Sequence, residues 1–141
     1  MYPSDFKSRL RAGRLCLSTS LFTRDAPIVA AIYQLKPDWV WIDQEHAPWG
    51  TESVGILGVL ARQMGVAGVI RVAWNDPGLI KKAYDVGAVG VIVPQVDTPD
   101  EARAAVRRFA DVGVERIMLQ DFIPRDLAMV DVMGEELVGR V

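Results

Sequence analysis

The hydrophobic positions of this chain form short apolar runs separated by longer amphipathic stretches. The runs at residues 39–43, 67–72 and 89–93 are continuous rather than alternating, as expected for parallel strands covered on both faces. The stretches between them have apolar residues at helical spacing. Strand-like and helix-like segments alternate at intervals of roughly 25 residues, which is typical of βα units. The pattern therefore predicts an α/β fold with a parallel sheet.

Prolines and glycines mark the ends of the predicted helices. Pro27 and Pro77 lie at helix starts, and Gly65 and Gly87 follow helix ends. Strands are predicted at 15–18, 39–43, 67–72, 89–93 and 115–119, and helices at 6–12, 27–36, 51–64, 77–85, 98–110 and 125–138. A closed eightfold barrel typically needs about 250 residues. Five strands therefore predict an open sheet, a partial barrel or a fragment of one.

Composition limits the function classes. The chain has 141 residues, 50% of them hydrophobic, and a formal net charge of −2, which gives no electrostatic reason to expect a nucleic acid or membrane partner. No apolar run is long enough to span a bilayer, and the first residues lack the hydrophobic region of a signal peptide. Cys16 is the single cysteine, so no internal disulfide can form. We expect a cytoplasmic protein.

Charged residues appear abruptly where the apolar strands end. Asp43, Glu45 and His46 follow the second strand, and Arg71 ends the third. In a parallel sheet these ends share one edge, where α/β proteins tend to build active sites. A histidine exchanges protons near neutral pH, an arginine can stabilise an enolate oxygen, and carboxylates can bind a hard divalent cation. The set suits proton abstraction next to a carbonyl, or aldol chemistry.

Each of these residues also has a structural interpretation. His46 could be a surface residue, and Arg71 could form an internal salt bridge with Asp43, because an unpaired arginine is costly to bury. The four tryptophans could form a substrate wall, but most are expected to pack in the core or loops. Cys16 is interpreted as a small hydrophobic residue.

Four motifs resemble one known family. They stand in order and with family-like spacing between residues 5 and 108: WIDQEHAP at 41–48, IRVAWNDP at 70–77, DVGA at 85–88 and VIVPQV at 91–96. Together they resemble the HpcH/HpaI aldolases, which are metal-dependent (class II) pyruvate aldolases. The resemblance implies a (β/α)₈ barrel, usually in a hexamer, that cleaves 4-hydroxy-2-oxo acids to pyruvate and an aldehyde with Mg²⁺ or Mn²⁺.

The resemblance also implies roles for four residues. His46 corresponds to the general acid/base, and Arg71 to the arginine that stabilises the pyruvate enolate. Asp43 matches the aspartate beside the histidine loop, and Asp85 matches the partner of the histidine in a dyad. Because Asp85 ends a helix, it belongs at the opposite end of its βα unit from His46. Contact between them is therefore expected across a subunit interface of a homo-oligomer.

The family's metal ligands, a Glu and an Asp on later strands, lie beyond the matched residues. Asp121, which follows the fifth strand, and Glu45 are the candidates that this chain offers. The alternative for Asp121 is a turn or helix N-terminal residue. The metal ligands are thus left open.

The last part of the chain differs in charge and in resemblance. Residues 1–110 carry a net charge of +2 and residues 111–141 a net charge of −4. From about residue 107 the sequence resembles the C-terminal unit of luciferase-like flavin or deazaflavin monooxygenases, which predicts a junction near 107–111 within one partial barrel over residues 1–141. Two other functions therefore stand beside the aldolase: a non-catalytic barrel fragment that self-associates, and a piece of a flavin-dependent oxidoreductase.

Overall fold

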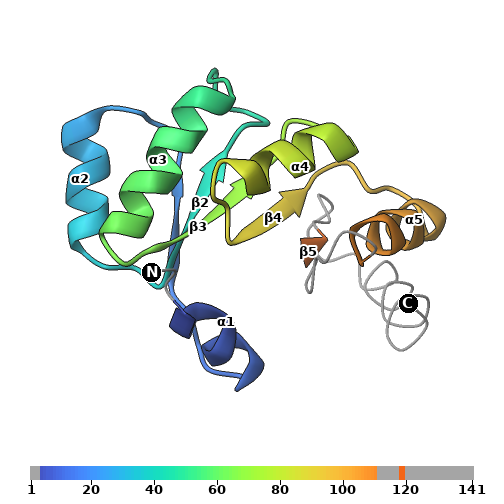
Figure 1. Ribbon diagram of the computed structural model, residues 1–141, viewed down its shortest axis with the longest axis horizontal. Helices are drawn as coiled ribbons and strands as arrows, with labels where there is room; N and C mark the ends of the chain where they lie inside the picture. The colour runs from blue at the N-terminus through green and yellow to red at the C-terminus, as the bar shows by residue number, and fades with distance from the viewer. Residues whose placement is uncertain (1–3, 111–117, 120–141) are drawn as a thin grey trace.

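Within the part of the chain that the structure describes, five parallel strands in chain order form one sheet (Figure 1). The computed structural model describes residues 4–110 and 118–119. The strands are β1 (Ser18–Leu21), β2 (Trp39–Asp43), β3 (Ala67–Arg71), β4 (Gly90–Val93) and β5 (Met118–Leu119). The helices are α1 (Ser4–Arg11), α2 (Ala26–Gln34), α3 (Thr51–Gln63), α4 (Pro77–Asp85) and α5 (Pro99–Ala110).

The strand order is that of consecutive βα units in a barrel. Each strand pairs in parallel with the next one along the chain, and a helix lies between them in sequence. The predicted α/β fold of barrel type, with part of the full set of strands, is confirmed. The predicted helix at 125–138 and most of the strand at 115–119 lie outside the described residues.

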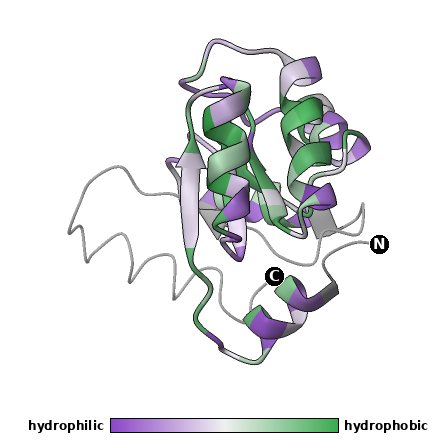
Figure 2. Cartoon of the chain, turned by 90° about the vertical axis from the view of Figure 1, so that its left-hand side faces the viewer, coloured by the Kyte–Doolittle hydropathy of each residue, from purple (hydrophilic) through white to green (hydrophobic). Residues whose placement is uncertain are grey.

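The core lies between the sheet and helices α2, α3 and α4, which cover one of its faces (Figure 1). Val40 and Ile42 of β2 are fully buried there, as are Ile70 of β3 and Leu21 of β1. Because strand side chains alternate in direction, Trp39, Trp41 and Asp43 belong to the other face of the sheet. Figure 2 shows that hydrophobic residues concentrate where the helices meet the sheet, whereas β1 at its edge is nearly neutral.

Capping groups fix the helix limits that the sequence predicts. The carboxylate of Asp25 accepts the backbone N–H of Ile28 at 3.2 Å, and Asp76 caps α4 in the same way. Gly65 and Gly87 follow α3 and α4 with φ values of +78° and +98°, a conformation that favours glycine. The starts of α2 and α4 and the ends of α3 and α4 are therefore set by local interactions.

The first strand was predicted three residues too early. The apolar residues Leu15 and Leu17, which suggested a strand at 15–18, are 80% and 65% exposed. The observed β1 begins at Ser18, which lies opposite Trp39, and its buried residue is Leu21. Pairing with β2, rather than local hydrophobicity, sets the position of β1.

Helix α1 lies near the N-terminal ends of the strands (Figure 1). Arg9 of this helix forms an ion pair with Asp38, which immediately precedes β2. Phe6 packs at a tilted angle against Trp39, with ring centroids 6.2 Å apart. Of the helices that the structure describes, none is both long and apolar enough to cross a membrane.

Candidate active site at the strand ends

Asp43 and Arg71 are the last residues of two neighbouring strands and lie opposite each other in register. Asp43 is fully buried and Arg71 is 3% exposed. Two hydrogen bonds join them, from Arg71 Nε to one carboxylate oxygen at 2.8 Å and from Nη2 to the other at 2.7 Å. This paired geometry fixes the guanidinium relative to the sheet. The internal salt bridge, which the sequence offered as the structural alternative for Arg71, is present.

Two further side chains hold the Arg71 guanidinium. Its Nη1 lies 2.9 Å from Glu45 Oε2, an ion pair that is not aligned as a hydrogen bond. The ring of Trp41 covers one face, with its centroid 4.6 Å from Arg71 Cζ. The guanidinium is therefore contacted along its edges by two carboxylates and on one face by an indole.

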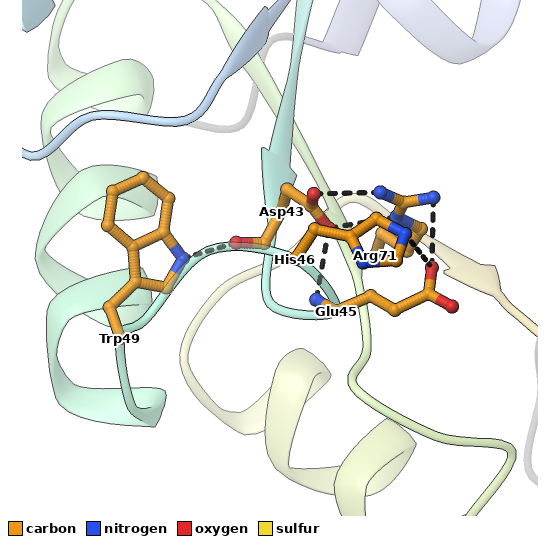
Figure 3. A network of polar contacts seen from close by, with 5 residues as sticks. All are labelled: Asp43, Glu45, His46, Trp49 and Arg71. Carbon is orange, nitrogen blue, oxygen red and sulfur yellow. Dashed lines mark hydrogen bonds and ion pairs between the residues drawn. The ribbon is translucent and has the colours of Figure 1, made fainter.

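The loop after β2 is fixed by bonds to Asp43. The Asp43 carboxylate accepts the backbone N–H of Glu45 at 3.0 Å, and its backbone carbonyl accepts a hydrogen bond from the Trp49 indole. His46 lies between these anchored positions, with its side chain 60% exposed and Nε2 3.7 Å from Glu45 Oε2 (Figure 3). The loop thus presents an accessible imidazole beside a buried cation.

The electrostatics of the pair keep Asp43 ionised. Burial alone would raise the pKa of this carboxyl, but the hydrogen bonds from Arg71 and from the backbone N–H groups of Glu45 and His46 outweigh burial. The pKa of Asp43 is therefore lowered below its ordinary value. Asp43 and Arg71 form a charged pair at neutral pH rather than a neutral one.

The structure brings together four of the residues that the sequence singled out, Asp43, Glu45, His46 and Arg71. Sequence reasoning treated Glu45 as a metal candidate and missed its ion pair with Arg71. It also missed the contacts of Trp41 and Trp49. The signal for Trp41 was available, because residues two apart on a strand share a face, and Trp41 precedes Asp43 by two.

Asp85 lies elsewhere in the described chain. It is the last residue of α4 and therefore close to the start of β4, whereas His46 follows the end of β2. Its carboxylate is 58% exposed and pairs with Lys81 at 3.0 Å. A dyad between Asp85 and His46 within one chain does not fit this placement. The predicted contact across a subunit interface stays a prediction.

A divalent metal does not fit the described residues by themselves. No group of three or more His, Cys, Asp or Glu side chains suited to a metal ion occurs within residues 4–110 and 118–119. The carboxylates of Asp43 and Glu45 are already engaged by Arg71. Asp121, the other candidate ligand, lies outside the described residues.

Proteins similar to this chain include two bacterial aldolases. The chain is 40% identical over 102 residues to a hydroxypyruvate/pyruvate aldolase of Sagittula stellata, a match that covers 72% of this chain and 40% of the relative. It is 34% identical over 121 residues to a 4-hydroxy-2-oxo-heptane-1,7-dioate aldolase of Escherichia coli, covering 81% of this chain and 44% of the relative. The matched part of this chain thus spans less than half the length of these relatives.

A solved structure of an aldolase-family protein also matches less than half of its own length to this chain. The chain superimposes on an HpcH/HpaI aldolase/citrate lyase family protein from Burkholderia cenocepacia with a TM-score of 0.64 and 33% identity, covering 74% of this chain and 42% of that protein. A fructose-1,6-bisphosphate aldolase, with a TM-score of 0.50 and 16% identity, shares the fold alone.

The extent of the family match corrects one expectation. The family model for HpcH/HpaI aldolase/citrate lyase matches residues 21–120 and so continues past residue 107, where the sequence suggested a luciferase-like tail. That resemblance is not supported, and the interpretation as a piece of a flavin-dependent oxidoreductase has no remaining basis. Matched over most of its length, the chain belongs to the HpcH/HpaI aldolase/citrate lyase family.

Proposed function

We propose that this chain carries the pyruvate-handling part of an aldolase site, in which a 4-hydroxy-2-oxo acid is cleaved to pyruvate and an aldehyde. The observation that carries the proposal is the buried Arg71, fixed by Asp43 and Glu45 and adjacent to the accessible His46. Its relatives from Sagittula stellata and Escherichia coli are named as aldolases of oxo acids. The substrate class is taken from them.

Arg71 supplies a permanent positive charge where the reaction develops a negative one. Cleavage removes the proton of the 4-hydroxyl group and breaks the C3–C4 bond, whose electron pair becomes the enolate of pyruvate. C3 then takes up a proton, so that the products are pyruvate and the aldehyde. A preorganised cation stabilises such an enolate without rearranging during the reaction. Asp43 is assigned the role of holding Arg71 in place.

His46 is assigned the proton transfers. Its imidazole is accessible, and its loop is anchored on both sides by bonds to Asp43. General acid/base catalysis needs a group held within reach of the substrate that can both take and return a proton. Asp85 of a neighbouring copy is the proposed dyad partner. Within one chain, Asp85 lies near the start of β4, whereas His46 follows the end of β2, so the two are at opposite ends of the strands.

A divalent cation, Mg²⁺ or Mn²⁺, belongs to this proposal through the family resemblance alone, because the described residues offer no complete set of ligands. It would supply Lewis-acid polarisation of the 2-oxo group when bound. The steps assigned above concern only Arg71, His46, Asp43 and Asp85.

Exchange of the methyl protons of pyruvate tests the proposal directly. In D₂O with added Mg²⁺ or Mn²⁺, the chain should form the enolate reversibly and place deuterium at C3, measured as a mass increase of pyruvate. General acid/base groups typically contribute about 10²–10⁴-fold in rate, so His46→Ala should lose the exchange almost entirely. Asp85→Asn, tested in the same way, should slow it.

Surface substitutions provide the control. Lys7→Ala alters α1 at the opposite end of the strands and should leave exchange unchanged. If the folded wild-type chain exchanges no faster than His46→Ala, the proposal is wrong. The self-associating barrel fragment is then favoured, since Leu15, Leu17 and Phe22 are exposed around β1, which pairs on one side only among the described strands.

A further inference from the structure

Trp41 lies beneath the Arg71 guanidinium on the face of the sheet that carries the site. It precedes Asp43 by two residues on β2, so the two side chains share a face. Its partner in register is Val69, which precedes Arg71 by two residues on β3. This placement brings the indole ring to 4.6 Å from Arg71 Cζ.

The ring contact adds to the restraint that the two carboxylates place on the guanidinium. The bidentate pair with Asp43 fixes one edge, and the ion pair of Nη1 with Glu45 opposes tilting of the plane about that edge at a single point. A ring against the face opposes the tilt, and a cation over an aromatic face is also attracted to it electrostatically. The edge and face contacts together define one orientation.

The indole N–H is separate from this contact. Trp41 Nε1 is buried and has no hydrogen-bond partner among the described residues. Replacing Trp41 by phenylalanine would therefore keep an aromatic face while removing no hydrogen bond of the described protein. The aromatic face of Trp41 and its N–H group can therefore be tested separately by substitution.

We propose that Trp41 is a positioning residue that fixes the orientation of Arg71 through its ring face. For catalysis this inference rests on the proposed function, because a correctly oriented Arg71 matters only if an enolate forms beside it. The orientation itself is a property of the folded chain. Misplacing a group that stabilises a transition state lowers kcat more than it raises KM.

The test compares Trp41→Leu, which removes the aromatic face, with Trp41→Phe, which keeps one. The first readout is the Nε–H resonance of Arg71 by NMR, assigned by its absence in Arg71→Lys. In the wild type this proton should be shifted by the ring and exchange slowly with water, because it is buried and bonded to Asp43. In Trp41→Leu we expect the shift to be lost and exchange to become about tenfold faster. Trp41→Phe should retain most of the protection.

The second readout is the deuterium exchange of pyruvate. Trp41→Leu should lower its kcat by about tenfold with a smaller change in KM, and Trp41→Phe should restore most of the loss. The matched control is Trp39→Leu, because Trp39 occupies the same strand face but packs on Phe6 at the other end of β2. Trp39→Leu should leave the chemical shift and the slow exchange of the Arg71 Nε–H unchanged.

Three outcomes would overturn the inference. The Arg71 resonance could keep its shift and slow exchange in Trp41→Leu, it could be lost equally in Trp39→Leu, or Trp41→Phe could lose as much as Trp41→Leu. If Trp41→Leu does not fold, Trp41→Met replaces it, since methionine fills irregular spaces. If the wild-type chain shows no exchange of pyruvate, the proposed function fails, while the NMR comparison still decides the role of Trp41.

Discussion

Strand β2 has an arginine–aspartate pair at each of its two ends. Asp38 precedes the strand and pairs with Arg9 of α1, and Asp43 ends it and pairs with Arg71 of β3. The side chains of the first pair are 28% and 19% exposed, whereas those of the second are 4% and 0% exposed. The same chemical pair therefore occurs in two environments on one strand.

The difference shows how burial changes the free-energy cost of breaking an ion pair. At the start of β2, water can solvate either partner if the other leaves, so the pair mainly ties α1 to the sheet. At the end of β2 neither charge can be left alone without a large desolvation cost. The buried pair therefore constrains geometry tightly, which suits a site where a cation must stay in one place.

The largest effect is expected at the buried pair. Asp43→Ala leaves the charge of Arg71 buried without its bidentate partner and should lower the free energy of unfolding by about 3–5 kcal/mol. Urea denaturation followed by circular dichroism measures the loss.

The triple variant Asp43→Leu/Glu45→Gln/Arg71→Met is the control, because it also removes the charge of Glu45, whose side chain is 7% exposed and pairs with Arg71. Replacing a whole buried ion cluster is often neutral, so this chain should recover most of the stability while losing any exchange of pyruvate. A triple variant as unstable as Asp43→Ala would mean that the volume or the backbone bonds of Asp43, rather than the unpaired charge, account for the loss.

A smaller effect is expected from pH. The pKa of Asp43 is lowered in the folded chain, so its contribution to stability is present above about pH 4 and is lost as the pH falls through the folded-state value. Asp38 behaves in the same direction, chiefly because its carboxylate accepts the backbone N–H of Leu17 at 2.7 Å. The free energy of unfolding should therefore decrease between about pH 5 and pH 3.

Replacing each aspartate by asparagine distinguishes the contributions of Asp43 and Asp38 to the pH dependence. Asp43→Asn and Asp38→Asn should each flatten the acid side of the stability curve, measured by urea denaturation at a series of pH values. A curve for Asp43→Asn that is as steep as the wild-type curve would contradict the lowered pKa of the buried carboxyl.

The smallest effect is expected at the half-buried pair of Arg9 and Asp38. Arg9→Ala removes the ion pair of α1 with Asp38 but leaves the bond from Leu17 to that carboxylate. The urea midpoint should shift far less than in Asp43→Ala, and the shift should shrink further in 1 M NaCl because salt screens exposed charges. A loss similar to that of Asp43→Ala would show that burial does not govern the difference between the pairs.

Much of the fold was predictable from local pattern. Continuous apolar runs identified β2, β3 and β4 within a residue or so, and Pro27 and Pro77 marked the starts of α2 and α4. The strand β1 was displaced, because Ser18 and Thr19 carry no hydrophobic signal and the register with β2 is a long-range property.

The candidate site was predictable in its members and in the pairing of Asp43 with Arg71, but not in its other contacts. Asp43 and Arg71 could be placed at one edge of the sheet because parallel strands end together. The sequence could not show that Glu45 would contact the same guanidinium, since the path of the loop after β2 depends on bonds to Asp43 and on the anchoring of Trp49. The separation of Asp85 from His46 followed from helix direction alone.

The sequence by itself determined the βα period, the family and the residues at the strand ends, because these depend on local spacing and residue type. Only the tertiary structure decided which charges are buried, which carboxylates hold Arg71 and which ring lies against it. Burial and contact are set by register between strands that are far apart in the chain. Two arginine–aspartate pairs on one strand, alike in composition, therefore differ in their energetics only once the chain is folded.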